Sequence, residues 1–330
     1  MTKEARIERA REAVERHKAV YYNDGEYVRA DFWDFAEIFE IIDDLYEVTG
    51  DKSYFTMFEE MYRFVLRRYG EDWEKNPFND DIMWLVIAFT RAYLYTGERR
   101  YLDIAVLNYE KTFARSASDD LGGGLFWRVE NETKNTCVNC PAAVAADYLA
   151  KATGDDTYYD KLFYCLDWVV KNLFEPETGK VYDAYRLDGK KSNWSSTYNQ
   201  GTFIGSCLAY YLKTGDKTYL GYAEKAADYT MNEMYHGGIM DNEEPGNDLP
   251  GFKGILARYI RRFAELADRP IYLEWLQRNA DSAWENRNSK GIMWTQLSHK
   301  TEERDDYDVF AVSAAVSVVV NSVGGMEVKI

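Results

Sequence analysis

The chain has 330 residues, of which 46% are hydrophobic and 29% are charged. These values are ordinary for a globular protein and exclude a disordered chain. Its 56 acidic and 40 basic side chains give a net charge of −16, which argues against nucleic acid and anionic membranes as partners because both would be repelled. A neutral ligand is indifferent to this charge.

Apolar residues recur at helical spacing along most of the chain, as at Phe32, Phe35, Phe39 and Ile42. Only six prolines occur, which favours long helices. The pattern predicts an all-α protein of twelve helices. Their expected bounds in chain order are 3–22, 31–48, 51–69, 79–96, 98–116, 138–153, 155–173, 198–214, 216–234, 250–267, 270–287 and 305–321.

A six-residue pattern marks the corners between these helices. It begins with Thr-Gly and an acidic residue and ends with Tyr, at 49–54, 96–101, 153–158 and 214–219, with a degenerate copy at 267–272. Glycine fits the left-handed position that ends a helix, and the acidic residue can cap the next helix. The corners therefore join the helices in pairs, and the even-numbered helices are the more apolar. Six inner and six outer helices predict a closed (α/α)6 toroid that forms one domain over residues 1–330, with an open solenoid as the alternative.

Long loops precede each of the six inner helices and meet on one face, since all inner helices begin there. They cover residues 23–30, 70–78, 117–137, 174–197, 235–249 and 288–304. Function usually lies on long loops held by a rigid scaffold, so we place the site on this face. Four loops contain a glycine followed by apolar residues, which predicts either short β-like segments or loop segments packed on helix ends. These stretches are 124–127, 179–182, 238–240 and 291–294.

Two adjacent carboxylates begin the fourth predicted helix, in the sequence Asn79-Asp80-Asp81. We expect Asn79 to cap this helix and both aspartates to lie in its first turn, where the positive helix end favours their ionised forms. The neighbouring carboxylate opposes this and is expected to raise the pKa of one of the two. Two carboxyl groups with different pKa values are what glycoside hydrolysis needs. The alternative is that the aspartates only stabilise the helix.

Polar and aromatic side chains gather at the starts of the other inner helices. They include Trp33, Asn139, Tyr198, Asn199, Gln200, Phe252 and Lys253. Amides bind hydroxyl groups and aromatic faces pack on the C–H surface of sugars, so the mixture suits a neutral polyhydroxylated ligand. Gln200 is not needed for capping, and we interpret it as a hydroxyl-binding group. Lys253 is either the partner of a carboxylate or an ordinary exposed lysine.

The sequence has no pattern of a metal or cofactor site. The histidines at 17, 236 and 299 lack metal-ligand spacing, and Cys137 and Cys140 form a lone pair with no second pair of ligands. No glycine-rich phosphate or dinucleotide motif occurs. We therefore expect free thiols and neither metal nor cofactor.

Several motifs resemble glycoside hydrolase family 76, the endo-α-1,6-mannanases. They are Asn79-Asp80-Asp81, the stretches 198–205 and 252–259, and the region of Asn139. The resemblance implies an (α/α)6 barrel that hydrolyses α-1,6-mannosidic bonds with retention and without a metal or cofactor. It implies that Asp80 is the nucleophile and Asp81 the general acid/base. The same resemblance implies that Trp33, Asn139, Tyr198, Asn199, Gln200, Phe252 and Lys253 shape the sugar subsites.

Three rival functions remain open on the sequence alone. A sugar epimerase or isomerase would use histidine bases, but no histidine begins an inner helix. A hydrolase or lyase for uronic acids would need several arginines at the mouth, where only Arg128 and Arg186 are obvious. An inactive carbohydrate-binding relative is the third. We expect a monomer that binds neutral mannan and neither nucleic acid nor membrane, intracellular as the chain stands and secreted or surface-attached if a leader was removed.

Overall fold

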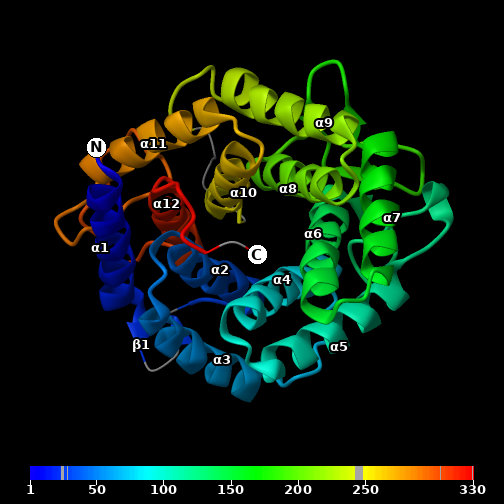
Figure 1. Cartoon of the computed structure of the whole chain (residues 1–330), viewed down its shortest axis with the longest axis horizontal. Coiled ribbons are helices and arrows are strands. Elements are labelled where there is room, and N and C mark those ends of the chain that lie inside the picture. The colour runs from blue at the N-terminus through cyan, green and yellow to red at the C-terminus, as the bar shows by residue number, and fades with distance from the viewer. Residues whose placement is uncertain (24–25, 28, 242–247, 305, 329) are drawn as a thin grey trace. The chain divides into compact units, whose positions relative to one another are not determined.

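The structure is a computed structural model. It describes all residues except 24–25, 28, 242–247, 305 and 329. Helices dominate this described part of the chain, which divides into two compact units (Figure 1). The first unit comprises residues 1–68 and 230–329, and the second comprises residues 69–229 and 330. The single domain over residues 1–330 stays a prediction.

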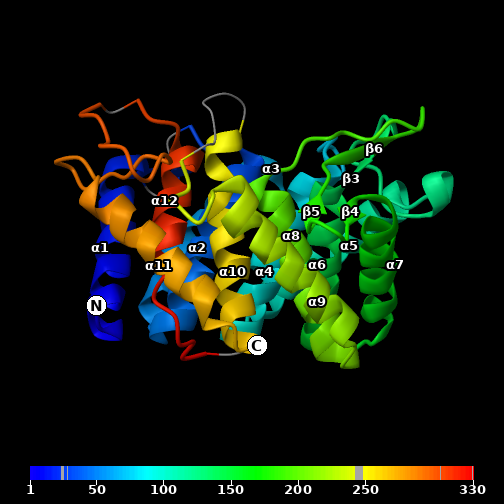
Figure 2. The same cartoon turned by 90° about the horizontal axis from the view of Figure 1, so that it is seen from above.

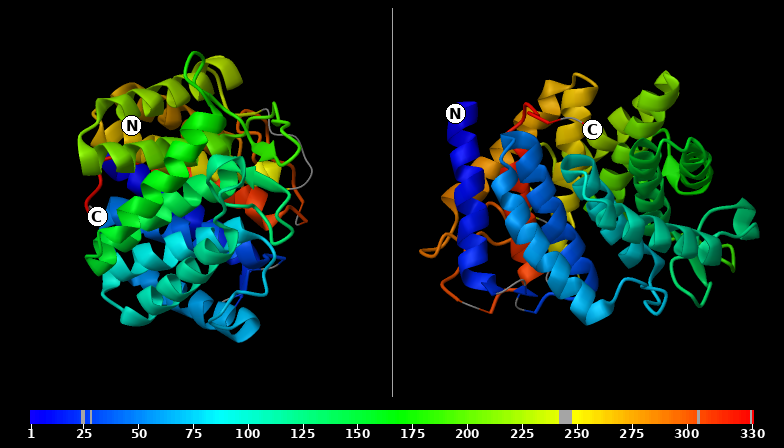
Figure 3. Two further views of the ribbon diagram at one scale, coloured as in Figure 1. Left: turned by 90° about the vertical axis from the view of Figure 1, so that its right-hand side faces the viewer. Right: turned by 60° about the horizontal axis from the view of Figure 1, so that its bottom comes forward.

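The first unit contains the helices from the two ends of the chain. They are α1 (Lys3–Tyr21), α2 (Phe32–Thr49), α3 (Phe55–Tyr69), α10 (Lys253–Leu266), α11 (Pro270–Glu285) and α12 (Val309–Asn321), with short helices η1 (Lys52–Tyr54) and η4 (Leu249–Gly251) and the strands β1 (Tyr22–Asn23) and β2 (Glu26–Tyr27). The apolar helix α12 packs against α1, α2 and α10 (Figure 3). Ring contacts join α2 to α3, including Phe39 to Phe58 at 4.4 Å between centroids.

The second unit contains the middle of the chain. Its helices are α4 (Asn79–Thr96), α5 (Arg99–Ser116), α6 (Thr136–Thr153), α7 (Thr157–Asn172), α8 (Thr197–Thr214) and α9 (Lys217–Asp228), with η2 (Asp120–Gly122) and the start of the π-helix η3 (Tyr229–Met234). The strands are β3 (Thr133–Asn135), β4 (Phe174–Glu175), β5 (Lys180–Val181) and β6 (Ala184–Arg186). β3 pairs antiparallel with β6, and β4 with β5. These strands lie at the end of the unit where α6 and α8 begin (Figure 2).

The Thr-Gly corners form as predicted. Gly50, Gly97, Gly154 and Gly215 all adopt the left-handed conformation, with φ between 67° and 76°. In the first corner the Thr49 hydroxyl donates to the carbonyl four residues earlier and accepts the N–H two residues later. The same two hydrogen bonds recur in the other three corners. Threonine thus adds a second donor to a carbonyl of the last helical turn and accepts the N–H after the glycine, which explains its place in the repeat.

Two of the four predicted β-like segments are confirmed. Residues 180–181 form β5, and residues 125 and 126 make isolated bridges to 117 and 134. The segments at 238–240 and 291–294 form no strand, so the loop alternative applies there. Side chains take the place of a strand partner: the Met240 N–H donates to Asn279, and the Trp294 N–H donates to Thr301.

A ladder of buried ion pairs joins α2 to α10 in the first unit. It consists of Asp44 and Glu47 on α2 and Arg258, Arg261 and Arg262 on α10. Asp44 Oδ2 accepts from Arg258 Nε at 2.8 Å, and Asp44 Oδ1 lies 3.5 Å from Arg261 Nη2. Glu47 accepts from Arg261 through one oxygen and from Arg262 at 2.6 Å through the other. Every oxygen of these two fully buried carboxylates therefore has a cationic donor.

Candidate active site

The start of α4 differs from the prediction in one detail. Phe78 is the residue before the first turn, and Asn79 lies inside it rather than capping it. The Asn79 amide donates to the Phe126 carbonyl at 2.8 Å, and its oxygen accepts from Arg115 at 2.7 Å. The Asn79 amide donates through its nitrogen and accepts through its oxygen, so it bonds both the loop after α5 and Arg115. Asn79 therefore ties that loop to the start of α4.

Asp80 and Asp81 lie in the first turn of α4, as predicted, and their surroundings differ. Asp81 is partly exposed, and its Oδ2 accepts from the Asn76 side chain at 3.0 Å. Asp80 is only 8% exposed, and its Oδ1 is buried without a hydrogen-bond partner. The two neighbouring carboxyl groups are therefore distinct: one is held by an amide near solvent, and one is desolvated.

Desolvation dominates the electrostatics of Asp80. Burial raises its pKa to about 7, while the nearby Cys137 thiol, the Trp127 indole and the N–H groups of the first turn favour the charged form and lower it. A carboxyl group that changes charge near neutral pH is typical of catalytic sites. The carboxylates of the α2–α10 ladder are buried just as deeply, but they face arginines.

A third carboxylate, Asp183 between β5 and β6, lies close by. Asp183 Oδ1 accepts from Asn199 Nδ2 at 3.0 Å, and Oδ2 accepts from Asn135 Nδ2 at 3.4 Å. Because an ionised carboxylate only accepts, these bonds fix the orientation of both amides. The Oδ1 atoms of Asn135 and Asn199 are then left buried without a hydrogen-bond partner. These two oxygens are acceptors that the hydroxyl groups of a sugar could donate to.

Tyr198 and Cys137 connect these groups. Burial raises the pKa of the Tyr198 phenol and of the Cys137 thiol, and the negative charges of Asp80 and Asp183 add to both shifts. The Tyr198 ring stacks on Trp84 of α4, with 6.2 Å between centroids. The starts of α4, α6 and α8 therefore bring Asp80, Cys137 and Tyr198 together, as the convergence of inner helices predicted.

Two predicted sugar contacts have a different role. Asn139 is fully buried and its amide donates to the carbonyls of Leu125 and Asn135, while Leu125 N–H donates to its oxygen. Gln200 is also fully buried, and its amide donates to the carbonyls of Gly179 and Ala226. Neither amide has an N–H left for a sugar. Sequence reasoning could not distinguish a polar side chain that binds a ligand from one that binds a loop, and these two hold the loops that carry the site.

The remaining predicted residues lie in the first unit. Trp33 packs edge-on against Phe310, with 4.3 Å between centroids, and lies 6.1 Å from Phe252. Lys253 is fully buried, which excludes the exposed lysine, and its ammonium group donates to the carbonyls of Met240 and Thr295 at 2.9 and 2.6 Å. Trp33 and Phe252 therefore lie near each other, and Lys253 anchors two loops.

A second perturbed carboxyl lies beside these rings in the first unit. Burial, together with the negative charges of Asp31, Asp308 and Asp248, raises the pKa of Asp34 to about 8. Asp34 Oδ2 accepts the Asp31 N–H at 3.0 Å and so closes the first turn of α2. The sequence showed these acidic residues near helix starts, but not that loops bring them together.

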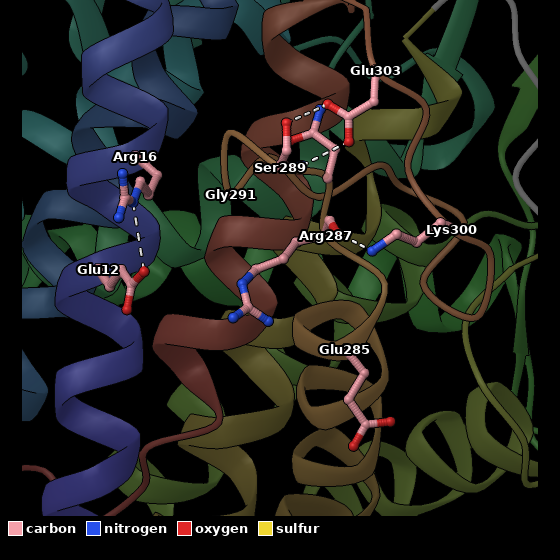
Figure 4. Close-up of a pocket in the computed structure, with 9 residues that line it drawn as sticks. Glu12, Arg16, Glu285, Arg287, Ser289, Gly291, Lys300 and Glu303 are labelled. Atoms are coloured by element: carbon pink, nitrogen blue, oxygen red, sulfur yellow. Dashed lines mark hydrogen bonds and ion pairs between the residues drawn. The ribbon is translucent and has the colours of Figure 1, made fainter.

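A polar hollow of about 480 Å³ lies elsewhere in the first unit, between α1 and the loop after α11 (Figure 4). Most of its charged groups already have partners. Arg16 pairs with Glu12 at 3.5 Å, Glu303 accepts from the Ser289 N–H at 2.8 Å, and Lys300 donates to the Arg287 carbonyl. We therefore interpret this hollow as part of the loop scaffold.

The described part of the chain offers neither a metal cluster nor a membrane-spanning helix. No group of three or more histidine, cysteine or acidic side chains there could hold a metal ion, and no helix there is long and apolar enough to cross a membrane. All four cysteines are free and buried. Burial raises the pKa of Cys140 and Cys165 above the ordinary thiol value, which disfavours reactive thiolates.

The chain is similar to known mannanases. The model of glycosyl hydrolase family 76 matches residues 8–328. The mannan endo-1,6-alpha-mannosidase DCW1 of Saccharomyces cerevisiae is 27% identical over 256 residues, which are 68% of this chain and 57% of the yeast protein. The chain thus spans little more than half the length of that relative.

Solved structures give the same result for the fold. The GH76A α-1,6-mannanase from Salegentibacter sp. HEL1_6 matches with a TM-score of 0.89 and 29% identity over 96% of this chain and 98% of that one. A variant of the same enzyme, inactive through replacement of two consecutive aspartates, was solved with α-1,6-mannotetrose and is 28% identical, again with a TM-score of 0.89 over 96% of this chain and 98% of that one.

Together the fold and the family match place the chain in a family of glycoside hydrolases with the helical (α/α)6 fold. The chain belongs to glycosyl hydrolase family 76, the α-1,6-mannanase family. The predicted family and (α/α)6 fold are therefore confirmed.

Proposed function

We propose that this protein is a retaining glycoside hydrolase that cleaves α-1,6-mannosidic bonds within a neutral mannan or manno-oligosaccharide. The observation that carries the proposal is the pair formed by Asp80 and Asp81, adjacent in sequence and held in different environments. The Salegentibacter mannanase supports it, because replacing two consecutive aspartates inactivated that enzyme, which then bound α-1,6-mannotetrose.

The two carboxyl groups have separate roles in the proposed reaction. The Asp80 carboxylate attacks the anomeric carbon while Asp81 donates a proton to the departing glycosidic oxygen, so the C–O bond breaks and a mannosyl ester forms on Asp80. Asp81, now a carboxylate, then takes a proton from water. That water attacks the anomeric carbon and releases the Asp80 carboxylate, and two inversions give net retention.

The environments suit these roles. Asp80 is buried against the starts of α4 and α6, where its backbone is fixed by the first helical turn, as a nucleophile requires. Asp81 is partly exposed, so it can exchange protons with water between the two steps. The unpaired Asn135 and Asn199 oxygens would accept hydroxyl protons of the sugar next to Asp80.

The test is hydrolysis of linear α-1,6-mannotetraose, with the anomeric configuration of the product followed by proton NMR. We expect the α-anomer to appear first, before mutarotation. A β-anomer appearing first would contradict the retaining mechanism. Failure of a well-folded sample to cleave this substrate, or equal cleavage by Asp80→Asn, would overturn the proposed function.

A further inference from the structure

Trp194 stands apart from the other tryptophans of the chain. The structure describes all nine, and Trp194 is the exposed one, with 42% of its surface accessible. Its backbone N–H donates to the Ser192 hydroxyl, but within the described residues its indole makes no recorded ring contact. An exposed indole presents a large flat apolar face on which a ligand can pack.

The position of Trp194 links it to the candidate active site. Its carbonyl accepts the backbone N–H of Asp183 at 3.0 Å, and the Asp183 carboxylate holds Asn135 and Asn199. Two residues after Trp194, Ser196 caps α8, and its hydroxyl accepts the Asn199 N–H at 3.4 Å. The backbone of Trp194 is therefore fixed at both ends to residues of the acceptor cluster, while its ring remains in solvent.

The same loop provides a comparison. Leu187 is 49% exposed, and its N–H donates to the Glu132 carbonyl, one residue before β3. It lies at the tip of the turn after β6, where Gly189 N–H donates to the Arg186 carbonyl. Leu187 is thus as exposed as Trp194, but no hydrogen bond joins it to the Asp183 cluster, and it lacks a flat ring.

We propose that Trp194 is a stacking platform for a sugar ring of the bound glycan, beyond the ring that lies at Asp80. A pyranose has one apolar C–H face, and an indole presents the large flat surface that such a face packs on. This inference rests on the proposed function and adds to it: Trp194 would set the preference for longer chains. The net charge of −16 does not oppose a neutral glycan.

The experiment measures glycan affinity in the Asp80→Asn background, so that it does not depend on turnover. Calorimetry compares linear α-1,6-manno-oligosaccharides of two to six units for this variant with and without Trp194→Ala. We expect Trp194→Ala to weaken binding of the longest chain about five- to tenfold more than that of the shortest. Trp194→Phe should restore most of the difference because it keeps a flat ring. Leu187→Ala is the matched control and should not change the ratio of the affinity for the longest chain to that for the shortest.

The outcomes separate the two proposals. If the intact chain does not hydrolyse the glycan but Asp80→Asn binds it with the Trp194-dependent length preference, the proposed function fails and the platform stands. If the intact chain cleaves the glycan and Trp194→Ala changes all lengths equally or none, the platform is overturned. The platform is also overturned if Asp80→Asn binds no glycan, or if Trp194→Ala alters only self-association in sedimentation.

Discussion

Two polar clusters in this protein both contain buried carboxylates, but the oxygens of those carboxylates are paired differently. In the α2–α10 ladder, Asp44 and Glu47 are fully buried and every carboxylate oxygen has a donor. At the start of α4, Asp80 is 8% exposed and its Oδ1 has no hydrogen-bond donor. The Oδ1 atom of the fully buried Asn199 also has no donor. Burial alone therefore does not distinguish a structural cluster from a functional one.

This difference in hydrogen bonding indicates which cluster binds a ligand. A buried polar atom without a partner costs about 1–3 kcal/mol of folding free energy. The free protein can tolerate this cost at a binding site, because the bound ligand supplies the missing hydrogen-bond partner. The two carboxylates of the ladder are fully paired in the free protein and should serve stability. The Asp80 cluster is incomplete and should serve binding and catalysis.

The largest expected effect is on activity. Asp80→Asn should lower kcat on α-1,6-mannotetraose by at least about 10³-fold, because an amide cannot form the glycosyl ester. Its melting temperature should not fall, since no hydrogen bond to Asp80 Oδ1 is lost. Steady-state kinetics and calorimetry check both. If Asp80→Asn instead lowered the melting temperature and left kcat nearly unchanged, the Asp80 cluster would be structural and not catalytic.

The ladder should show the opposite behaviour. Arg261→Met removes a donor from both Asp44 and Glu47 and leaves buried charge uncompensated. We expect the free energy of unfolding to fall by about 3–5 kcal/mol. Urea denaturation measures it. A loss below about 1 kcal/mol would show that the ladder is not a stabilising element.

The pH dependence of stability should sharpen the contrast. Burial raises the pKa of Asp80 from its ordinary value near 4 to about 7 in the folded state. The folded chain therefore keeps a proton that the unfolded chain releases, and this contribution to stability is lost as the pH rises from about 4 through about 7. Asp80→Asn has no such proton to lose. Its free energy of unfolding should therefore rise by up to about 4 kcal/mol relative to that of the intact chain between pH 4 and pH 8. Thermal unfolding at four pH values measures the gain, and a difference that does not vary with pH would contradict it.

The smallest expected effect concerns Cys137. Asp80 must be ionised to attack, so kcat/KM should fall as the pH drops below about 7. The Cys137 thiol lowers the pKa of Asp80. Cys137→Ala should therefore move this fall of kcat/KM, the acidic limb of the pH profile, to higher pH by less than about one unit. Cys137→Ser keeps a donor and is the control. An unchanged limb in Cys137→Ala would show that the thiol does not act on Asp80.

The sequence predicts the helices well because their signals are local. The Thr-Gly corners fix a left-handed glycine and a threonine hydrogen bond within six residues, so their positions follow from the repeat. Asp80 and Asp81 could be found in the same way, since two acidic residues open one apolar helix. The observed bounds of α4 agree with the predicted 79–96.

The rest of the site depends on contacts between distant segments. Asp183 was missed because nothing in its own surroundings marks it, and only the folding of β3 and β6 against α8 brings it between Asn135 and Asn199. Asn139 and Gln200 were interpreted as ligand groups because a polar residue at a helix start has the same pattern whether it binds a sugar or a loop carbonyl.

The central claim is that Asp80 is the nucleophile of a retaining reaction, and trapping the intermediate tests it most directly. The intact chain would be incubated with a 2-deoxy-2-fluoro-α-mannosyl fluoride carrying a further α-1,6-linked mannose, then digested and analysed by mass spectrometry. The account predicts a glycosyl adduct on the peptide at Asp80, absent from Asp80→Asn. An adduct on Asp81 or Asp183, or α-product release with Asp80→Asn at the intact rate, would contradict it.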